Sequence, residues 1–126
     1  MGTDIYLEWN NQTSEQHQAQ ITGFALAGNK GYLRAAIWNH DVNHLYQEVF
    51  PNDYWTGDKD RFIFSNEGLL KLEQAITNFK FRNKQKGDPE MNDENRERYA
   101  QELRDFYKLG LELESRGLEP KVQISW

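Results

Sequence analysis

Two histidines, His40 and His44, stand four residues apart in the segment His-Asp-Val-Asn-His. On a helix, side chains at this spacing lie on one face, where two imidazole rings can bridge one metal ion. A metal centre needs a further donor, for which the sequence offers His17, Glu48, Asp53 and Asp58. The competing interpretation makes Asp41 a helix cap, which leaves His40 outside the helix and makes both histidines ordinary surface or partly buried residues.

A second cluster of interest is aromatic and spans residues 38–64. It contains Trp38, Tyr46, Phe50, Tyr54, Trp55, Phe62 and Phe64, interrupted by Asp53, Asp58 and Asp60. Aromatic walls with a few carboxylates suit a small polar or cationic ligand. The alternative is a plain core, because a chain poor in aliphatic residues must bury aromatic ones. The candidate contacts for a ligand or partner are Trp38, Tyr46, Tyr54 and Trp55.

Tyr54 and Trp55 stand apart from the rest of this cluster. They fall in residues 51–60, where Pro51 and the Asn-Asp and Gly-Asp pairs predict turns rather than core structure. An exposed Tyr-Trp pair on a loop is typical of the anchors that bury in a partner protein. The sequence therefore predicts a protein contact here, either with another protein or with a second copy of the chain.

Several other chemistries find little support in the sequence. The chain has no Cys, which excludes disulfide frameworks, thiolate zinc sites and cysteine nucleophiles. None of its serines lies in a Gly-x-Ser-x-Gly elbow, and there is no glycine-rich phosphate loop. The only basic run covers residues 80–86. These cations are explained by the negative end of a helix dipole, which they stabilise, more simply than by binding to single-stranded nucleic acid.

Composition narrows the class of protein further. The 126 residues include 15 Lys and Arg against 20 Asp and Glu, a net charge of −5. An acidic surface is repelled by nucleic-acid phosphates and anionic membranes, so neither is an expected partner. The sequence shows no secretion signal and no long apolar run, and we expect a cytoplasmic protein of one domain, residues 1–126, without a cofactor.

The N-terminal half must supply most of the elements that position these residues. Alternation of Ile5, Leu7 and Trp9 with polar residues predicts a strand over residues 3–9. Residues 10–20 are polar and Gln-rich, which favours a loop or one short turn, although residues 13–16 fit a helix-start box. Residues 21–27 are an extended candidate, and a turn at 28–31 leads to residues 31–38, which fit a strand or a helix equally. An apolar stripe predicts a helix from about residue 42 to residue 50, and residues 61–64 resemble a short strand.

The C-terminal half is more clearly patterned. Apolar stripes predict two main helices at about residues 66–81 and 90–116, the first capped by Ser65 and the second ended by Gly117. Alternating Val122, Ile124 and Trp126 predict a closing strand. The predicted fold class is α+β, with a small and mainly antiparallel sheet that includes the N- and C-terminal strands and is covered by the two main helices.

Short motifs at both ends resemble a group of small uncharacterised bacterial proteins. They are the start M-G-T-D-I-Y-L-E-W, the A-Q-I-T-G-F of residues 19–24, the G-Y-L-R of residues 31–34 and the closing P-K-V-Q-I-S-W. After residue 34 this chain continues A-A-I-W-N-H, where the group has a more acidic, glycine-containing continuation. The resemblance implies no activity and no catalytic residue.

Together these observations favour a non-catalytic cytoplasmic interaction or regulatory module over an enzyme. One alternative is a small metal- or ligand-dependent enzyme built on His40, His44 and the aromatic cluster. The other is a homodimeric structural protein.

Overall fold

The computed structural model describes residues 2–22, 31–36, 40–50, 62–78 and 93–125. Its elements in chain order are β1 (Gly2–Glu8), α1 (Ser14–Thr22), β2 (Tyr32–Ala36), α2 (His40–Val49), α3 (Asn66–Asn78), α4 (Asp93–Ser115) and β3 (Lys121–Ser125). The α+β class is confirmed, as are the two main helices and the presence of both terminal strands in one sheet.

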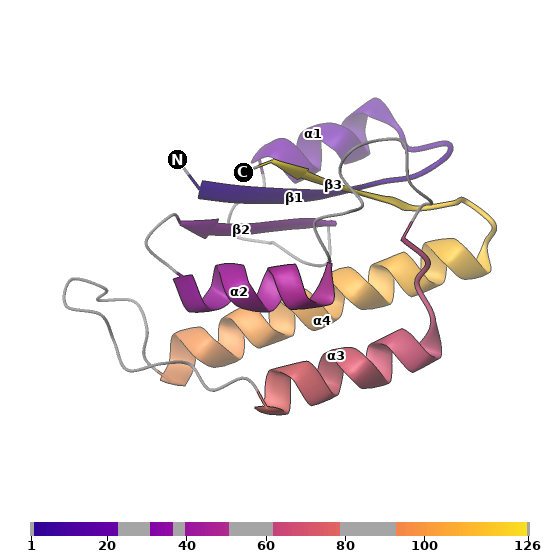
Figure 1. The fold of residues 1–126 in the computed structure, drawn as a ribbon. Helices are drawn as coiled ribbons and strands as arrows, with labels where there is room; N and C mark the ends of the chain where they lie inside the picture. The colour runs from indigo at the N-terminus through magenta and orange to yellow at the C-terminus, as the bar shows by residue number, and fades with distance from the viewer. Residues whose placement is uncertain (1, 23–30, 37–39, 51–61, 79–92, 126) are drawn as a thin grey trace.

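The described strands form one antiparallel sheet in the order β2-β1-β3 (Figure 1). The central strand β1 pairs Ile5 with Leu33 of β2 and with Ile124 of β3. Because side chains alternate across a strand, Ile5 and Leu7 of β1 share one face, and both are fully buried. The N-terminal alternation thus gave the correct strand and the correct buried face.

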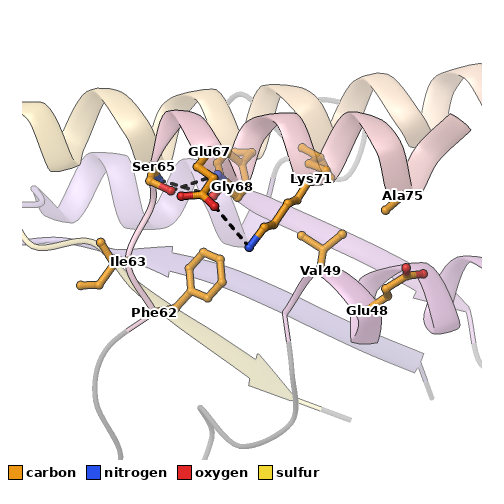
Figure 2. A pocket seen from close by; sticks show the side chains of 11 residues that line it. Glu48, Val49, Phe62, Ile63, Ser65, Glu67, Gly68, Lys71 and Ala75 are labelled. Carbon is orange, nitrogen blue, oxygen red and sulfur yellow. Dashed lines mark hydrogen bonds and ion pairs between the residues drawn. The ribbon is translucent and has the colours of Figure 1, made fainter.

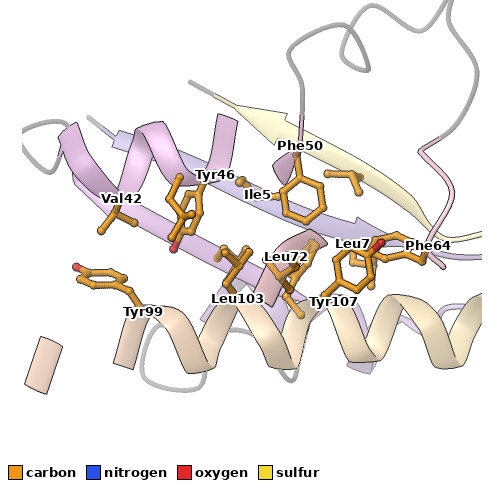
Figure 3. Close-up of a cluster of buried hydrophobic side chains, with 14 of the residues drawn as sticks. Ile5, Leu7, Val42, Tyr46, Phe50, Phe64, Leu72, Tyr99, Leu103 and Tyr107 are labelled. Carbon is orange, nitrogen blue, oxygen red and sulfur yellow. The ribbon is translucent and has the colours of Figure 1, made fainter. Parts of the chain in front are cut away.

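The helices divide unequally between the two sides of this sheet. In Figure 1, α2, α3 and α4 lie on one side, and α1 lies on the other. Figure 3 shows side chains from the sheet, α2 and α4 meeting in one layer, which is the hydrophobic core. Burial of whole Leu, Val and Phe side chains contributes roughly 1.5–3 kcal/mol each, so this layer is the main source of stability.

The helix ends follow the predicted signals. Ser65 Oγ accepts a 3.0 Å hydrogen bond from the Gly68 amide, which caps α3. After α4, Gly117 has φ +72°, and the Leu118 amide donates to the Leu113 carbonyl at 3.0 Å. These features form a Schellman motif, which needs the left-handed conformation that glycine adopts without strain.

Three expectations from the sequence were wrong or incomplete. Residues 14–22 form helix α1 instead of a loop, although the predicted box is present: the Gln16 amide donates to Thr13 Oγ1 at 3.1 Å. Strand β2 pairs with β1, and residues 21 and 22, which were predicted to be extended, belong to helix α1. Residues 62–65 form no strand because they are not paired in the described sheet, and Phe62 and Phe64 pack their rings against the core instead.

Some expectations lie outside the described residues. These are the structure of residues 23–30, the basic run at 80–86, the turns at 51–60 and the contribution of Trp126. Of the helices in the described part of the chain, none has the length and apolarity needed to span a membrane.

Candidate functional site

Of the four residues predicted to contact a ligand or partner, the structure describes only Tyr46. Tyr46 lies on the buried face of α2 and is 1% exposed, among Val42, Leu45 and the residues of α4 (Figure 3). Trp38, Tyr54 and Trp55 lie outside the described residues. Among the described residues, the aromatic cluster predicted from the sequence therefore contributes three buried rings to the core, those of Tyr46, Phe50 and Phe64.

The Tyr46 hydroxyl is unusual within this core. Among the described residues it has no hydrogen-bond partner, although the side chain is buried. Burial raises the pKa of Tyr46 well above its ordinary value, and the nearby Glu102 carboxylate raises it further. The hydroxyl therefore stays protonated at neutral pH.

The two histidines of the predicted metal site both belong to α2. His40 is the first residue of the helix rather than a residue outside it, and His44 is one turn later with an exposed side chain. His17, one of the proposed additional donors, lies on α1 across the sheet (Figure 1). The side chains described here include no group of three or more His, Cys, Asp or Glu that could hold a metal ion. The side chain of His40 is not among them, so its pairing with His44 stays a prediction.

A pocket of about 430 Å³ opens between the C-terminal end of α2 and the first turns of α3, and we call it the α2–α3 pocket (Figure 2). This volume falls in the range of roughly 300–1,000 Å³ typical of ligand sites. Its lining is Glu48 and Val49 from α2, Phe62, Ile63 and Ser65 from the segment before α3, Glu67, Gly68, Lys71, Leu72 and Ala75 from α3, and Tyr107 from α4.

The floor of the pocket is apolar and its rim is charged. Leu72 and Tyr107 are almost fully buried, whereas Ile63 is 58% exposed. Glu48, Glu67 and Lys71 are exposed around the opening. The opening therefore combines one exposed aliphatic side chain with charged groups, above a floor of buried apolar side chains.

The shape of the pocket depends on one close approach between helices. The Tyr107 hydroxyl of α4 accepts a 3.4 Å hydrogen bond from the Ser65 amide and lies directly against Gly68 of α3. A Cβ atom at Gly68 would overlap this hydroxyl, so only glycine lets Tyr107 close the floor. Burial raises the pKa of Tyr107, while hydrogen bonds from Ser65 oppose that rise.

Aromatic contacts hold the segment that precedes α3. The Phe62 ring meets the Phe50 ring edge to face at 5.2 Å and the Phe64 ring at 5.0 Å. Phe64 in turn contacts the Tyr107 ring at 5.0 Å. Each such aromatic pair contributes about 0.5–1.5 kcal/mol beyond the energy of its buried area. The pairs therefore hold the backbone of residues 62–64 in place, and with it the exposed Ile63.

The two carboxylates at the rim have different surroundings. Glu67 Oε1 lies 3.7 Å from Lys71 Nζ, one turn along α3. Glu48 has no ion pair or hydrogen bond among the described residues. The pocket therefore carries one compensated and one uncompensated negative charge.

The sequence analysis anticipated only part of this site. It placed Phe62 in an aromatic cluster and Val49 on an apolar stripe, but it did not single out Ile63, Gly68 or Lys71. A signal was present in the alternation of residues 62–64, where the two Phe side chains take one side and Ile63 takes the other. The role of Gly68 could not be predicted from the sequence, because it depends on a tyrosine of another helix.

Comparison with known proteins adds no assignment. No protein family model matches the chain, and neither the curated proteins nor the solved structures include a significant match. The resemblance to the small bacterial proteins stays a prediction.

Proposed function

We propose that the chain is a non-catalytic interaction module whose α2–α3 pocket receives an apolar side chain of a partner protein. The observation that carries this proposal is the pocket itself, a hollow of about 430 Å³ with an apolar floor, a charged rim and the exposed Ile63 at its edge. A few buried apolar anchors supply most of the affinity of protein contacts, and such anchors need pockets of this kind.

The segment that contains Tyr54 and Trp55 connects two parts of the chain that border this pocket. Residues 51–61 join Phe50, at the end of α2, to Phe62, which lines the pocket. The Tyr54-Trp55 contact predicted from the sequence lies outside the described residues and stays a separate prediction.

The raised pKa values among the described residues have a structural cause. The groups with a shifted pKa are Tyr6, Tyr32, Tyr46, Tyr107 and Glu102, and in each of them burial is the largest cause of a raised pKa. Desolvated tyrosines are common in structural cores. Acid-base catalysis calls for a group whose pKa is matched to the working pH and that can reach a substrate.

Selection from a displayed random peptide library tests the proposal. Immobilised protein should enrich peptides with an apolar anchor residue, and Ile63→Asp should abolish the enrichment by placing a charge at the edge of the pocket. Leu70→Asp is the matched control, since Leu70 is 66% exposed on α3 and does not line the pocket. Both variants should keep the melting temperature within a few degrees, because surface substitutions change stability by only about 0.5 kcal/mol.

Two results would count against the proposal. One is no enrichment above a blank surface, and the other is equal loss of enrichment in the Ile63 and Leu70 variants. Native mass spectrometry of the same samples detects self-association, which is the homodimer alternative.

A further inference from the structure

The α2–α3 pocket is electrically asymmetric, which bears on the partner that it would receive. At one end is the C-terminus of α2, where the Phe50 amide donates to the Tyr46 carbonyl at 2.8 Å and no basic residue occurs in the last turn. A helix C-terminus carries a partial negative charge of about half an elementary unit. The Glu48 carboxylate adds a full negative charge in this same turn.

At the other end the charges are balanced. Glu67 lies in the first turn of α3, where a carboxylate offsets the positive end of the helix dipole. Lys71 lies 3.7 Å from Glu67 and neutralises it further. The two ends of the pocket therefore differ in potential, although each contributes one glutamate.

Resting on the function proposed above, we infer that the partner segment carries a Lys or Arg next to its apolar anchor and that this cation pairs with Glu48. An anchor that contacts Val49 and Leu72 lies beside the last turn of α2, so the partner residue that flanks it on that side can reach Glu48. A cation there meets both the carboxylate and the negative end of the α2 helix dipole. An acidic residue in that place would be repelled by both.

The charge of the whole chain favours the same kind of partner. The net charge of −5 attracts a basic segment at long range and raises its rate of association. Long-range attraction alone does not distinguish Glu48 from Glu67. The local difference between the two ends of the pocket makes that distinction, and it can be tested.

The experiment uses the peptide most strongly enriched by the library, in three versions with Arg, Gln or Glu next to its apolar anchor. Binding is measured by fluorescence anisotropy at neutral pH and low ionic strength. The Arg peptide should bind about three- to tenfold more tightly than the Gln peptide, and the Glu peptide should bind most weakly. Glu48→Gln should remove the difference between Arg and Gln, whereas the control Glu67→Gln should preserve it.

The outcomes separate this inference from the proposed function. If all three peptides bind equally to the wild-type protein, the pocket is an apolar site without charge preference, and only the inference fails. If Glu67→Gln and Glu48→Gln reduce the preference equally, the cation responds to the acidic surface as a whole and the assignment to Glu48 is overturned. If Ile63→Asp leaves binding of all three peptides unchanged, the peptides do not use the pocket and the proposed function fails as well.

Discussion

The Tyr32 hydroxyl on β2 donates a 2.6 Å hydrogen bond to Oδ1 of Asp4 on the neighbouring strand β1. Arg34 Nε lies 3.9 Å from the same oxygen, and the Tyr6 ring stacks on the Tyr32 ring at 5.0 Å. Strand alternation puts these side chains on the sheet face opposite Ile5 and Leu33. They tie the two strands together on the side away from the helical core.

Tyr32→Phe should lower the free energy of unfolding by about 1.5–3 kcal/mol, because a hydrogen bond to an ionised acceptor is lost. Urea unfolding measures the change. Tyr6→Phe is the control: it keeps the ring stack and removes a hydroxyl that has no hydrogen bond to the described residues, so it should change stability by less than about 0.5 kcal/mol. Equal effects of the two substitutions would show that the bond to Asp4 contributes nothing measurable.

Stability should fall at alkaline pH because of the buried tyrosines. Burial raises the pKa of Tyr32, Tyr46 and Tyr107 in the folded protein. Below about pH 10 both states keep these protons, so the groups cause no pH dependence. Above it the unfolded chain binds fewer protons than the folded one, and stability decreases by up to about 1.4 kcal/mol per pH unit for each tyrosine.

Urea titrations at a series of pH values from about 9 to 11 would follow this decrease, with tyrosinate absorbance as the direct probe. The Tyr32→Phe variant lacks one of the shifted groups and should show a shallower slope. A wild-type stability that is independent of pH over this range would contradict the raised pKa values.

Gly110→Ala should destabilise the protein although alanine is the better helix former. Gly110 lies inside α4, where alanine ordinarily adds about 1 kcal/mol. Here an added Cβ would overlap the Phe64 ring, and such overpacking costs about 1–3 kcal/mol. Adding Phe64→Leu should reduce the cost of the alanine, and a double-mutant cycle in urea measures this coupling. A more stable Gly110→Ala protein would mean that Phe64 does not pack against this turn.

Tyr46→Phe should leave stability unchanged or increase it by about 1 kcal/mol. The buried hydroxyl of Tyr46 loses its water on folding and gains no hydrogen bond from the described residues. Thermal unfolding of the variant measures the effect, and Tyr32→Phe, whose hydroxyl is bonded, serves as the contrast. A loss of 1 kcal/mol or more would show that the Tyr46 hydroxyl has a partner that contributes to folding.

The sequence predicted most elements of the fold because local patterns carry them. Alternation marked the strands that contain Ile5 and Val122, and an apolar stripe marked the helix around Leu103. Helix α1 was missed because its Gln-rich sequence has no apolar stripe, and the buried residue among its described side chains is the polar Gln20. The pocket was missed for a different reason: the close approach of Tyr107 to Gly68 joins two helices, and spacing along the chain does not report such contacts.

The hydrogen bonds of the Gln20 side chain should hold α1 against the sheet. Gln20 is 1% exposed, and its Nε2 donates to the Leu7 carbonyl at 2.6 Å and to the Gly31 carbonyl at 3.3 Å. Gln20→Glu keeps the shape but replaces the donor with an acceptor that repels both carbonyls, so it should cost about 1–3 kcal/mol or more. Gln12→Ala is the control, since it removes only the 3.0 Å bond to Gln20 Oε1 and leaves the amide on the strand carbonyls.

Hydrogen exchange adds a local measurement to the unfolding data. Amides of α1 should exchange much faster in Gln20→Glu than in Gln12→Ala, while those of α4 should change only as far as global stability does. Uniform acceleration in both helices would mean that Gln20 stabilises the fold as a whole rather than holding α1 in place.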